Sequence, residues 1–193
     1  MVPSPSAPFS SVLSIPLVRT PGPDEIQESM LDVTPQDASA ALARLPSGLY
    51  VMTSAFEGKR AGVCVRWVTQ LAAEPPLIGV AMFRGHWVGP LIRDSHAFAI
   101  CRVDDADRLI AKKFADPARR EGDPFDCLPI ETIVTGAPVI RRSLVALDCV
   151  VIRHLDLEAD HSLYIGHVVG GRVYAQPSGD RKSTRLNSSH LVI

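Results

Sequence analysis

Short apolar runs rich in β-branched and aromatic residues, separated by turn residues, constrain the fold of this chain most strongly. Runs of this length and composition, bounded by Gly, Pro and Asp, are typical of strands. They predict strands over residues 49–55, 61–71, 77–83, 97–103, 131–135, 144–157 and 161–173. Glu57-Gly58-Lys59 predicts a turn that joins the first two strands in a hairpin, and residues 158–160 predict a second turn.

Helical patterns are short and few. Thr34 is an N-cap candidate, Pro35 suits the first helical position, and the helix is expected to end before Pro46. Residues 87–93 predict a helical turn, and residues 104–115 predict a helix that begins with an acidic turn. Strands and helices do not alternate, so the sequence predicts a mainly β, α+β fold built round a closed antiparallel barrel.

The 193 residues suit one domain with tails. Residues 1–33 are rich in Pro and Ser and predict an extended arm, and residues 34–179 predict the folded domain. Residues 180–190 read DRKSTRLNSSH, which resembles the translation of a sequencing-library adapter. We therefore interpret residues 180–193 as a non-native tail, with a natural polar tail as the alternative.

Charge and composition exclude several classes of function. A formal net charge of −1 gives no basic field for nucleic acid or anionic lipid. No segment is long and apolar enough to span a bilayer, and the start shows no signal-peptide pattern, so we expect a cytoplasmic protein. The chain has no Rossmann or P-loop glycine pattern. The cysteines lack metal-ligand spacing and predict reduced thiols and no metal site: Cys64, Cys101, Cys127 and Cys149.

A set of short motifs runs in order between residues 38 and 171. They are PSGLYV at 46–51, WVTQ at 67–70, EPPL at 74–77, LIRDS at 91–95, LIAKKF at 109–114, GAP at 136–138 and DH at 160–161. In order and spacing the set resembles the flavin reductase-like family of FMN-binding split barrels. The resemblance implies a closed antiparallel Greek-key split barrel with a few short helices, non-covalently bound FMN and NAD(P)H as co-substrate.

The resemblance also implies where the cofactor lies. The strand over residues 64–70 would lie against the flavin ring, and the loop after the next strand would hold the phosphate, with Arg84 as a phosphate ligand. The expected cofactor-binding residues are Cys64, Val65, Arg66, Trp67, Thr69, Gln70, Ala81, Arg84, His86, Trp87 and Cys101. The family pattern has hydroxyl residues where Cys64 and Arg66 stand, and an Asn where Cys101 stands. Arg66 instead places a cation near the ring or the phosphate, which favours an anionic reduced flavin.

His161 follows Asp160 at the start of a predicted strand. Related proteins place a histidine there near the nicotinamide or the flavin, so His161 is the catalytic candidate, in a substrate-positioning role. A surface histidine in a hairpin turn is the alternative. Trp67 likewise either flanks the flavin or fills the barrel.

The leading functional hypothesis is hydride transfer from NAD(P)H to bound FMN, followed by electron delivery to free flavin or another acceptor, including a partner oxygenase. By resemblance we expect a homodimer with the flavin site near the interface. Two alternatives remain open. One is a non-catalytic FMN-binding electron-transfer module, and the other is a split-barrel relative with a different ligand, such as haem or pyridoxal phosphate.

Overall fold

The computed structural model describes residues 22, 35–115 and 122–174. The chain divides into two compact units, residues 1–45 and 46–193. In the first unit, helix α2 (Pro35–Leu42) forms where the sequence predicts a helix. The predicted tail, and the predicted arm apart from Gly22, lie outside the described residues, so the boundaries at residues 34 and 179 stay predictions.

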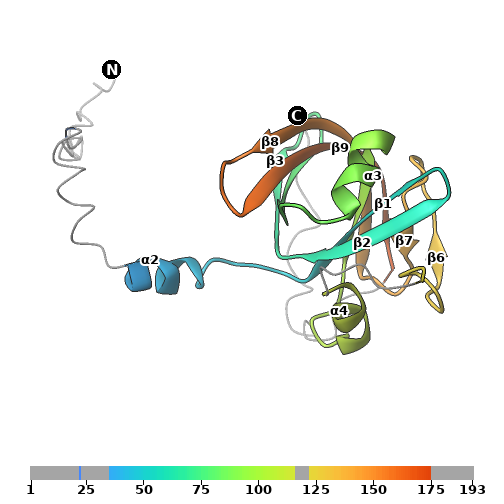
Figure 1. The fold of residues 1–193 in the computed structure, drawn as a ribbon, viewed down its shortest axis with the longest axis horizontal. Coiled ribbons are helices and arrows are strands. Elements are labelled where there is room, and N and C mark those ends of the chain that lie inside the picture. Colours follow the sequence, from blue (N-terminus) through green and yellow to red (C-terminus); the bar gives the residue numbers. More distant parts are fainter. Residues whose placement is uncertain (1–21, 23–34, 116–121, 175–193) are drawn as a thin grey trace, which may run out of the picture. The chain divides into compact units, whose positions relative to one another are not determined.

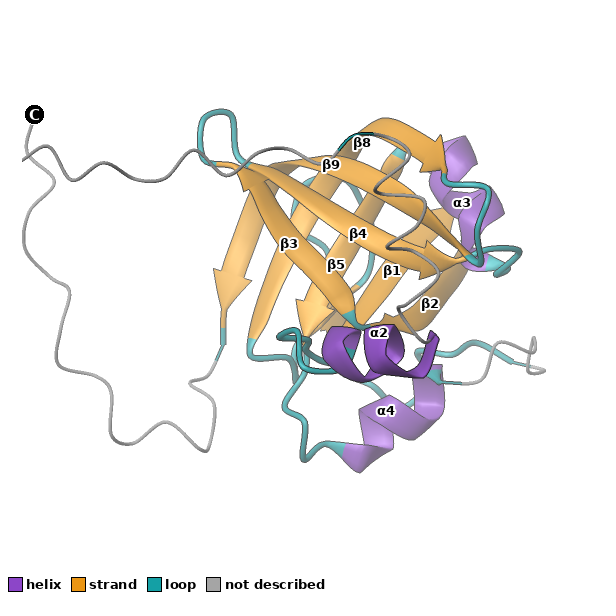
Figure 2. Ribbon diagram, turned by 90° about the vertical axis from the view of Figure 1, so that its left-hand side faces the viewer, coloured by secondary structure: helices purple, strands orange, loops and turns teal. Residues whose placement is uncertain are grey.

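The second unit is built on a seven-stranded antiparallel sheet in the order β2-β1-β5-β8-β9-β4-β3 (Figures 1 and 2). Its strands are β1 (Tyr50–Phe56), β2 (Lys59–Val65), β3 (Trp67–Ala72), β4 (Leu77–Phe83), β5 (Ala97–Arg102), β8 (Val145–Asp156) and β9 (His161–Val173). Two short helices, α3 (Val88–Ser95) and α4 (Arg108–Phe114), and a ribbon of β6 (Ile130–Glu131) and β7 (Val139–Ile140) complete the unit. The predicted mainly β, antiparallel fold is confirmed.

The strand predicted over residues 61–71 is wrong as a single element, because the chain changes partners at Arg66. Val65, the last residue of β2, pairs with Tyr50 of β1, whereas Trp67, the first residue of β3, pairs with Ala81 of β4. Two strands that follow each other in the chain therefore form the opposite edges of the sheet. No ladder joins β2 to β3 in the described part of the chain.

The sheet buries apolar side chains on both faces. On the inner face, Met52 of β1 and Phe98 of β5 pack with Val80 of β4, and α3 contributes Val88 and Ile92. The outer face of β1 and β5 packs against α4 and the β6–β7 ribbon, with the buried residues Val51, Ala99, Cys101, Ile110, Phe114, Phe125, Val139 and Ile140. Successive residues of a strand point to opposite faces, so β1 serves both cores with neighbouring side chains.

The strand predicted over residues 131–135 is also wrong beyond Glu131. The backbone amides of Val134 and Thr135 donate to a carboxylate oxygen of Asp148, at 2.6 and 2.8 Å. The hydroxyl of Thr135 donates to the other oxygen. Asp148 is fully buried on β8. Its side chain therefore accepts the backbone hydrogen bonds of this loop that a neighbouring strand would otherwise accept.

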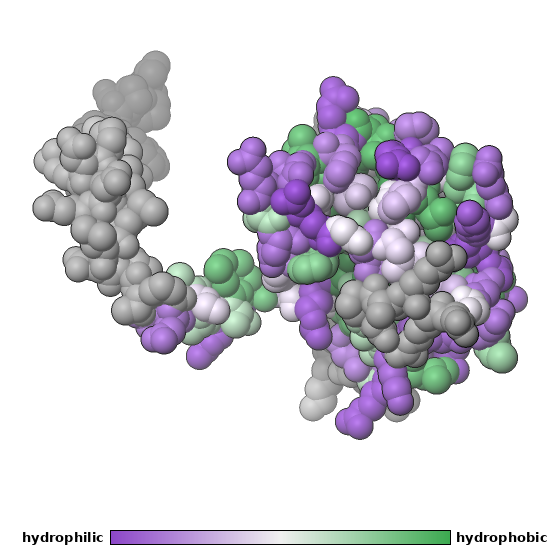
Figure 3. Space-filling view, in the orientation of Figure 1, coloured by the Kyte–Doolittle hydropathy of each residue, from purple (hydrophilic) through white to green (hydrophobic). Residues whose placement is uncertain are grey.

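The face of the second unit in Figure 3 is mixed, with hydrophilic side chains around smaller hydrophobic patches. Within the residues that the structure describes, no helix is long and apolar enough to cross a membrane.

Candidate functional site

A cavity of about 340 Å³ lies beside the junction of β2 and β3. Its walls come from Leu49, Cys64, Val65, Arg66, Trp67, Ala81, Phe83, Ala111, Ala115 and His161. Six of the residues predicted to bind the cofactor or substrate thus meet in one place: Cys64, Val65, Arg66, Trp67, Ala81 and His161. We call this space the β3 cavity.

Strand register explains why these side chains meet. Trp67 of β3 pairs with Ala81 of β4, and Phe83 of β4 pairs with His161 of β9, so all four stand on the same, outward face of the sheet. The intervening Met82 points to the core instead. Because Ala81 is small and lies between larger neighbours, it leaves room for a ligand over the strand.

Aromatic rings form one wall of the β3 cavity. The ring centroids of Trp67 and His161 are 4.8 Å apart. The ring of Phe83 meets His161 edge-on, with centroids 5.7 Å apart and an interplanar angle of 89°. Since Trp67 and Phe83 are each more than half exposed, this wall offers uncovered apolar area to a flat ligand.

Polar groups border the same cavity. Arg66 is exposed and makes no ion pair with any carboxylate in the described residues, so its charge is available to a ligand. Nδ1 of His161 lies 3.0 Å from a carboxylate oxygen of Asp160. Contact with His161 lowers the pKa of the exposed Asp160 carboxylate. Nδ1 of His161 is buried and has no hydrogen-bond partner within the described residues, so this contact does not fix the imidazole through a hydrogen bond.

The thiol of Cys64 is a weak donor rather than a nucleophile. Its sulfur lies 3.6 Å from the carbonyl oxygen of Ala111, the acceptor of an S–H···O bond. Burial raises the pKa of Cys64 to about 11, although the charge of Arg66 opposes this shift. At neutral pH the Cys64 thiol is therefore protonated and adds no negative charge beside Arg66.

Arg84, His86 and Trp87 lie elsewhere, around a cavity of about 560 Å³ next to α3. The guanidinium of Arg84 is 3.0 Å from Asp156 and donates to the carbonyl of Ala159 at 3.1 Å, so the predicted phosphate ligand already has partners on the β8–β9 hairpin. His86 is buried, which lowers its pKa. Its Nδ1 accepts from the Val88 amide at 3.2 Å, and its Nε2 has no partner within the described structure.

Three other predicted residues also lie apart from the β3 cavity. Thr69 and Gln70 line a third cavity, of about 420 Å³. Cys101 is fully buried in the outer core, where its sulfur accepts from the Ile140 amide at 3.4 Å and burial raises its pKa to about 12. The structure does not bring Cys101 to any of these three cavities.

Sequence reasoning missed four residues of the β3 cavity: Leu49, Phe83, Ala111 and Ala115. The two-residue period of a strand could have found Phe83, because it shares a face with Ala81. Ala111 and Ala115 carry no chemical signal, and only the placement of α4 against β2 brings them to the site.

A flat ring with polar edges and an acidic tail fits the residues of the β3 cavity. Trp67, Phe83 and Leu49 supply apolar area. In the described sheet β3 pairs only with β4, so main-chain N–H and C=O groups along its other edge are available to a ring edge. Arg66 supplies an uncommitted cation for an anionic group.

Comparison with known families agrees with this chemistry. Residues 42–185 match the family described as flavin reductase like domain. The chain belongs to this family. A flavin reductase like chain from Streptomyces viridifaciens, named NADPH-flavin oxidoreductase, is 30% identical over 131 residues, which cover 67% of this chain and 68% of that protein.

Solved structures of the family share the fold. The NADH:FAD oxidoreductase of Streptomyces globisporus superposes with a TM-score of 0.65 at 22% identity, covering 74% of this chain and 86% of that one. A homologue of nitrilotriacetate monooxygenase component B from Mycobacterium thermoresistibile gives 0.63 at 22% identity, covering 83% and 81%. The chain also matches diflavin flavoproteins of Synechocystis, but it spans only 20–24% of their length.

Proposed function

We propose that this flavin reductase like chain is an NAD(P)H-dependent flavin reductase that holds FMN in the β3 cavity. The observation that carries the proposal is the convergence of Trp67, Ala81 and His161 on one outward face, from three strands, with Arg66 lining the same cavity. The name of the Streptomyces viridifaciens relative supports the same activity. FMN held by these residues would supply the redox chemistry, namely hydride transfer from NAD(P)H and electron delivery to free flavin or another acceptor.

The residues of the chain bind and position. Trp67 and Phe83 cover apolar ring surface and exclude water from one side. Arg66 pairs with negative charge on the cofactor. His161, which packs against Trp67 and lines the cavity, positions the nicotinamide. Such a site needs no general base, since proximity of the two rings is the main requirement.

The finer architecture belongs to the same proposal. We infer that β2 and β3, joined through Arg66, bring the two sheet edges together as a Greek-key split barrel. Exposed apolar side chains near the cavity and on the β8–β9 hairpin support a homodimer with the flavin site near its interface: Trp67, Phe83, Leu155 and Leu157. The component B neighbour supports a partner oxygenase as one electron acceptor.

The test is reduced-nicotinamide turnover by the purified chain. NADH and NADPH oxidation would be followed at 340 nm with FMN, FAD and riboflavin in parallel. We expect turnover that saturates with flavin, and a rise in KM for the nicotinamide in His161→Ala. FMN binding without turnover would assign the chain to an electron-transfer module, and a haem or pyridoxal phosphate spectrum would assign another ligand.

A further inference from the structure

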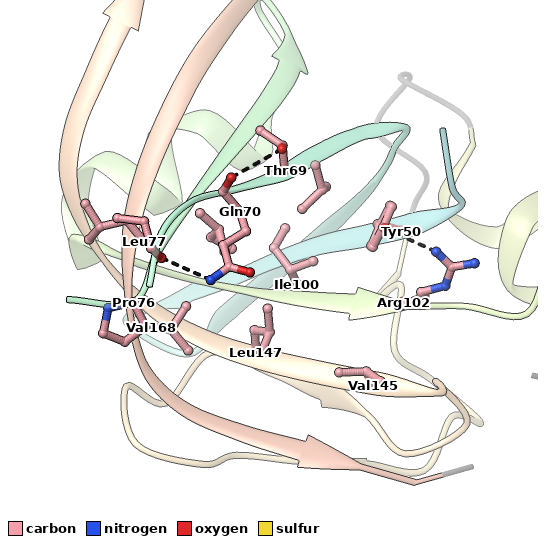
Figure 4. A pocket seen from close by; sticks show the side chains of 13 residues that line it. Tyr50, Thr69, Gln70, Pro76, Leu77, Ile100, Arg102, Val145, Leu147 and Val168 are labelled. Atoms are coloured by element: carbon pink, nitrogen blue, oxygen red, sulfur yellow. Dashed lines mark hydrogen bonds between the residues drawn. The ribbon is translucent and has the colours of Figure 1, made fainter. Parts of the chain in front are cut away.

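A third cavity, of about 420 Å³, opens on the inner side of the sheet (Figure 4). Its lining residues are Tyr50, Val68, Thr69, Gln70, Ala72, Pro76, Leu77, Ile78, Ile100, Arg102, Val145, Leu147 and Val168. We call it the inner cavity. It shares no lining residue with the β3 cavity.

Most of the inner cavity is apolar. Val68, Leu77, Ile100, Leu147 and Val168 are among its lining residues, and Figure 4 shows Ile100, Leu147 and Val168 close together on three strands. Burying an aliphatic or aromatic body against these groups is favourable at roughly 25 cal/mol per Å² of apolar area. The cavity therefore suits a ligand that is mainly hydrocarbon.

Two of its polar side chains already have hydrogen-bond partners. The amide nitrogen of Gln70 donates to the carbonyl of Ala72 at 3.2 Å. The hydroxyl of Thr69 donates to the carbonyl of Gln70 at 3.4 Å. One N–H of Gln70 and the Thr69 hydroxyl are thus engaged along β3 itself, and neither side chain carries a charge with which to recognise a charged group.

Tyr50 and Arg102 form the remaining polar corner of the inner cavity. The guanidinium of Arg102 donates to the Tyr50 hydroxyl at 3.2 Å and lies 5.5 Å from the centroid of the tyrosine ring. Because the hydroxyl oxygen accepts this bond, its own proton is free to donate to a ligand. Arg102 makes no ion pair with a carboxylate anywhere in the described residues, so this apolar cavity carries one uncompensated positive charge.

We propose that the inner cavity binds a hydrophobic carboxylate, with the carboxylate on Arg102 and Tyr50 and the hydrocarbon body along β3 and β8. A planar guanidinium beside one hydroxyl matches the oxygens of a single carboxylate. A nucleotide or phosphate ester needs more donors than this corner supplies. The proposal does not depend on flavin reduction, because the two cavities have separate linings.

Isothermal calorimetry on the full chain, with octanoate and octan-1-ol as probes, tests the proposal. The two probes share a chain length and differ in charge, so the wild type alone gives the first answer. Octanoate is expected to bind about tenfold more tightly than octan-1-ol, the ratio that one charge-assisted hydrogen bond supplies. Saturating FMN is expected to leave octanoate affinity unchanged.

Variants then locate the site. Arg102→Gln is expected to lower octanoate affinity about tenfold and to leave octan-1-ol affinity the same. Tyr50→Phe is expected to have a smaller effect in the same direction. Arg153→Gln is the matched control, because Arg153 is exposed and lines none of the cavities described. Circular dichroism checks that each variant is folded.

Three results would overturn the proposal. Equal affinity for the acid and the alcohol would show an apolar space without charge recognition. Displacement of octanoate by FMN would place the probe in the flavin site. No octanoate binding, with a dimer that persists on dilution, would assign the inner cavity to a contact between copies of the chain.

Discussion

Arg66 separates β2 from β3, lines the β3 cavity and forms no ion pair within the described residues. A positive charge beside the flavin stabilises its more negative, reduced state, so Arg66→Gln is expected to lower the midpoint potential of bound FMN. An interaction of about 1.4 kcal/mol corresponds to about 30 mV for a two-electron couple. Spectroelectrochemical titration measures the shift, and Arg66→Lys should keep most of the wild-type value. An unchanged potential in Arg66→Gln would separate this charge from the flavin.

The reactivity of the cysteines tests which of their thiols are buried and protonated. Burial raises the pKa of Cys64 to about 11 and the pKa of Cys101 and Cys149 to about 12, whereas Cys127 is exposed. At pH 8 about one Cys64 thiol in a thousand is ionised, and the thiolate is the reactive form. Iodoacetamide followed by mass spectrometry should therefore label Cys127 first. Labelling of Cys64 at the rate of Cys127 would contradict the buried, protonated thiol.

Among the elements, the loop before β7 depends on one buried carboxylate. One carboxylate oxygen of Asp148 accepts the amides of Val134 and Thr135, and the other accepts the Thr135 hydroxyl, so Asp148→Asn removes the charge and sets an NH2 group against one set of these donors. We expect the free energy of unfolding to fall by about 1–3 kcal/mol in urea titration. Asp94→Asn is the control and should change little, because Asp94 forms a surface ion pair with its exposed neighbour Arg93.

Helix α3 begins beside a buried histidine whose protonation the fold opposes. Burial places the pKa of His86 in the folded chain below its usual 6.5. As pH falls past 6.5 the unfolded chain takes up this proton first, so His86 makes stability decline with falling pH. In His86→Asn, whose side-chain oxygen can still accept from Val88, the decline between pH 7.5 and 5.5 should be shallower. An identical decline in urea titrations of both proteins would exclude His86 as its source.

The sequence predicted the strands that have strong local signals. It did not predict where the chain exchanges one neighbouring strand for another. The turn at Glu57 and Gly58 is correct, since both residues have the positive φ that a tight hairpin needs. The apolar run over residues 77–83 matches β4 residue for residue. The break at Arg66 has no local signal, because it arises when the chain exchanges β1 for β4 as its neighbour. The loss of strand beyond Glu131 likewise depends on Asp148, which lies far along the sequence.

For the whole molecule, the sequence predicted which residues gather at the β3 cavity better than it predicted their individual contacts. The family pattern pointed to the β2–β3 junction, and alternation along β3 and β4 brings Trp67 and Ala81 together there. Cys101 falls in the core because alternation along β5 turns it toward Val139 and Ile140. Arg84 is engaged by Asp156, a contact that only the β8–β9 hairpin creates. Both outcomes depend on packing between distant segments.

We propose that the β3 cavity holds FMN, so the decisive measurement is a fluorescence titration of FMN with the purified chain. Ala81→Leu fills the space between Trp67 and Phe83, whereas Ala41→Leu makes the same change on the exposed surface of α2. We predict quenching by the wild type and by Ala41→Leu, with affinity at least about tenfold lower in Ala81→Leu because of steric overlap. No quenching by the wild type, or equal affinity in Ala81→Leu, would contradict the account.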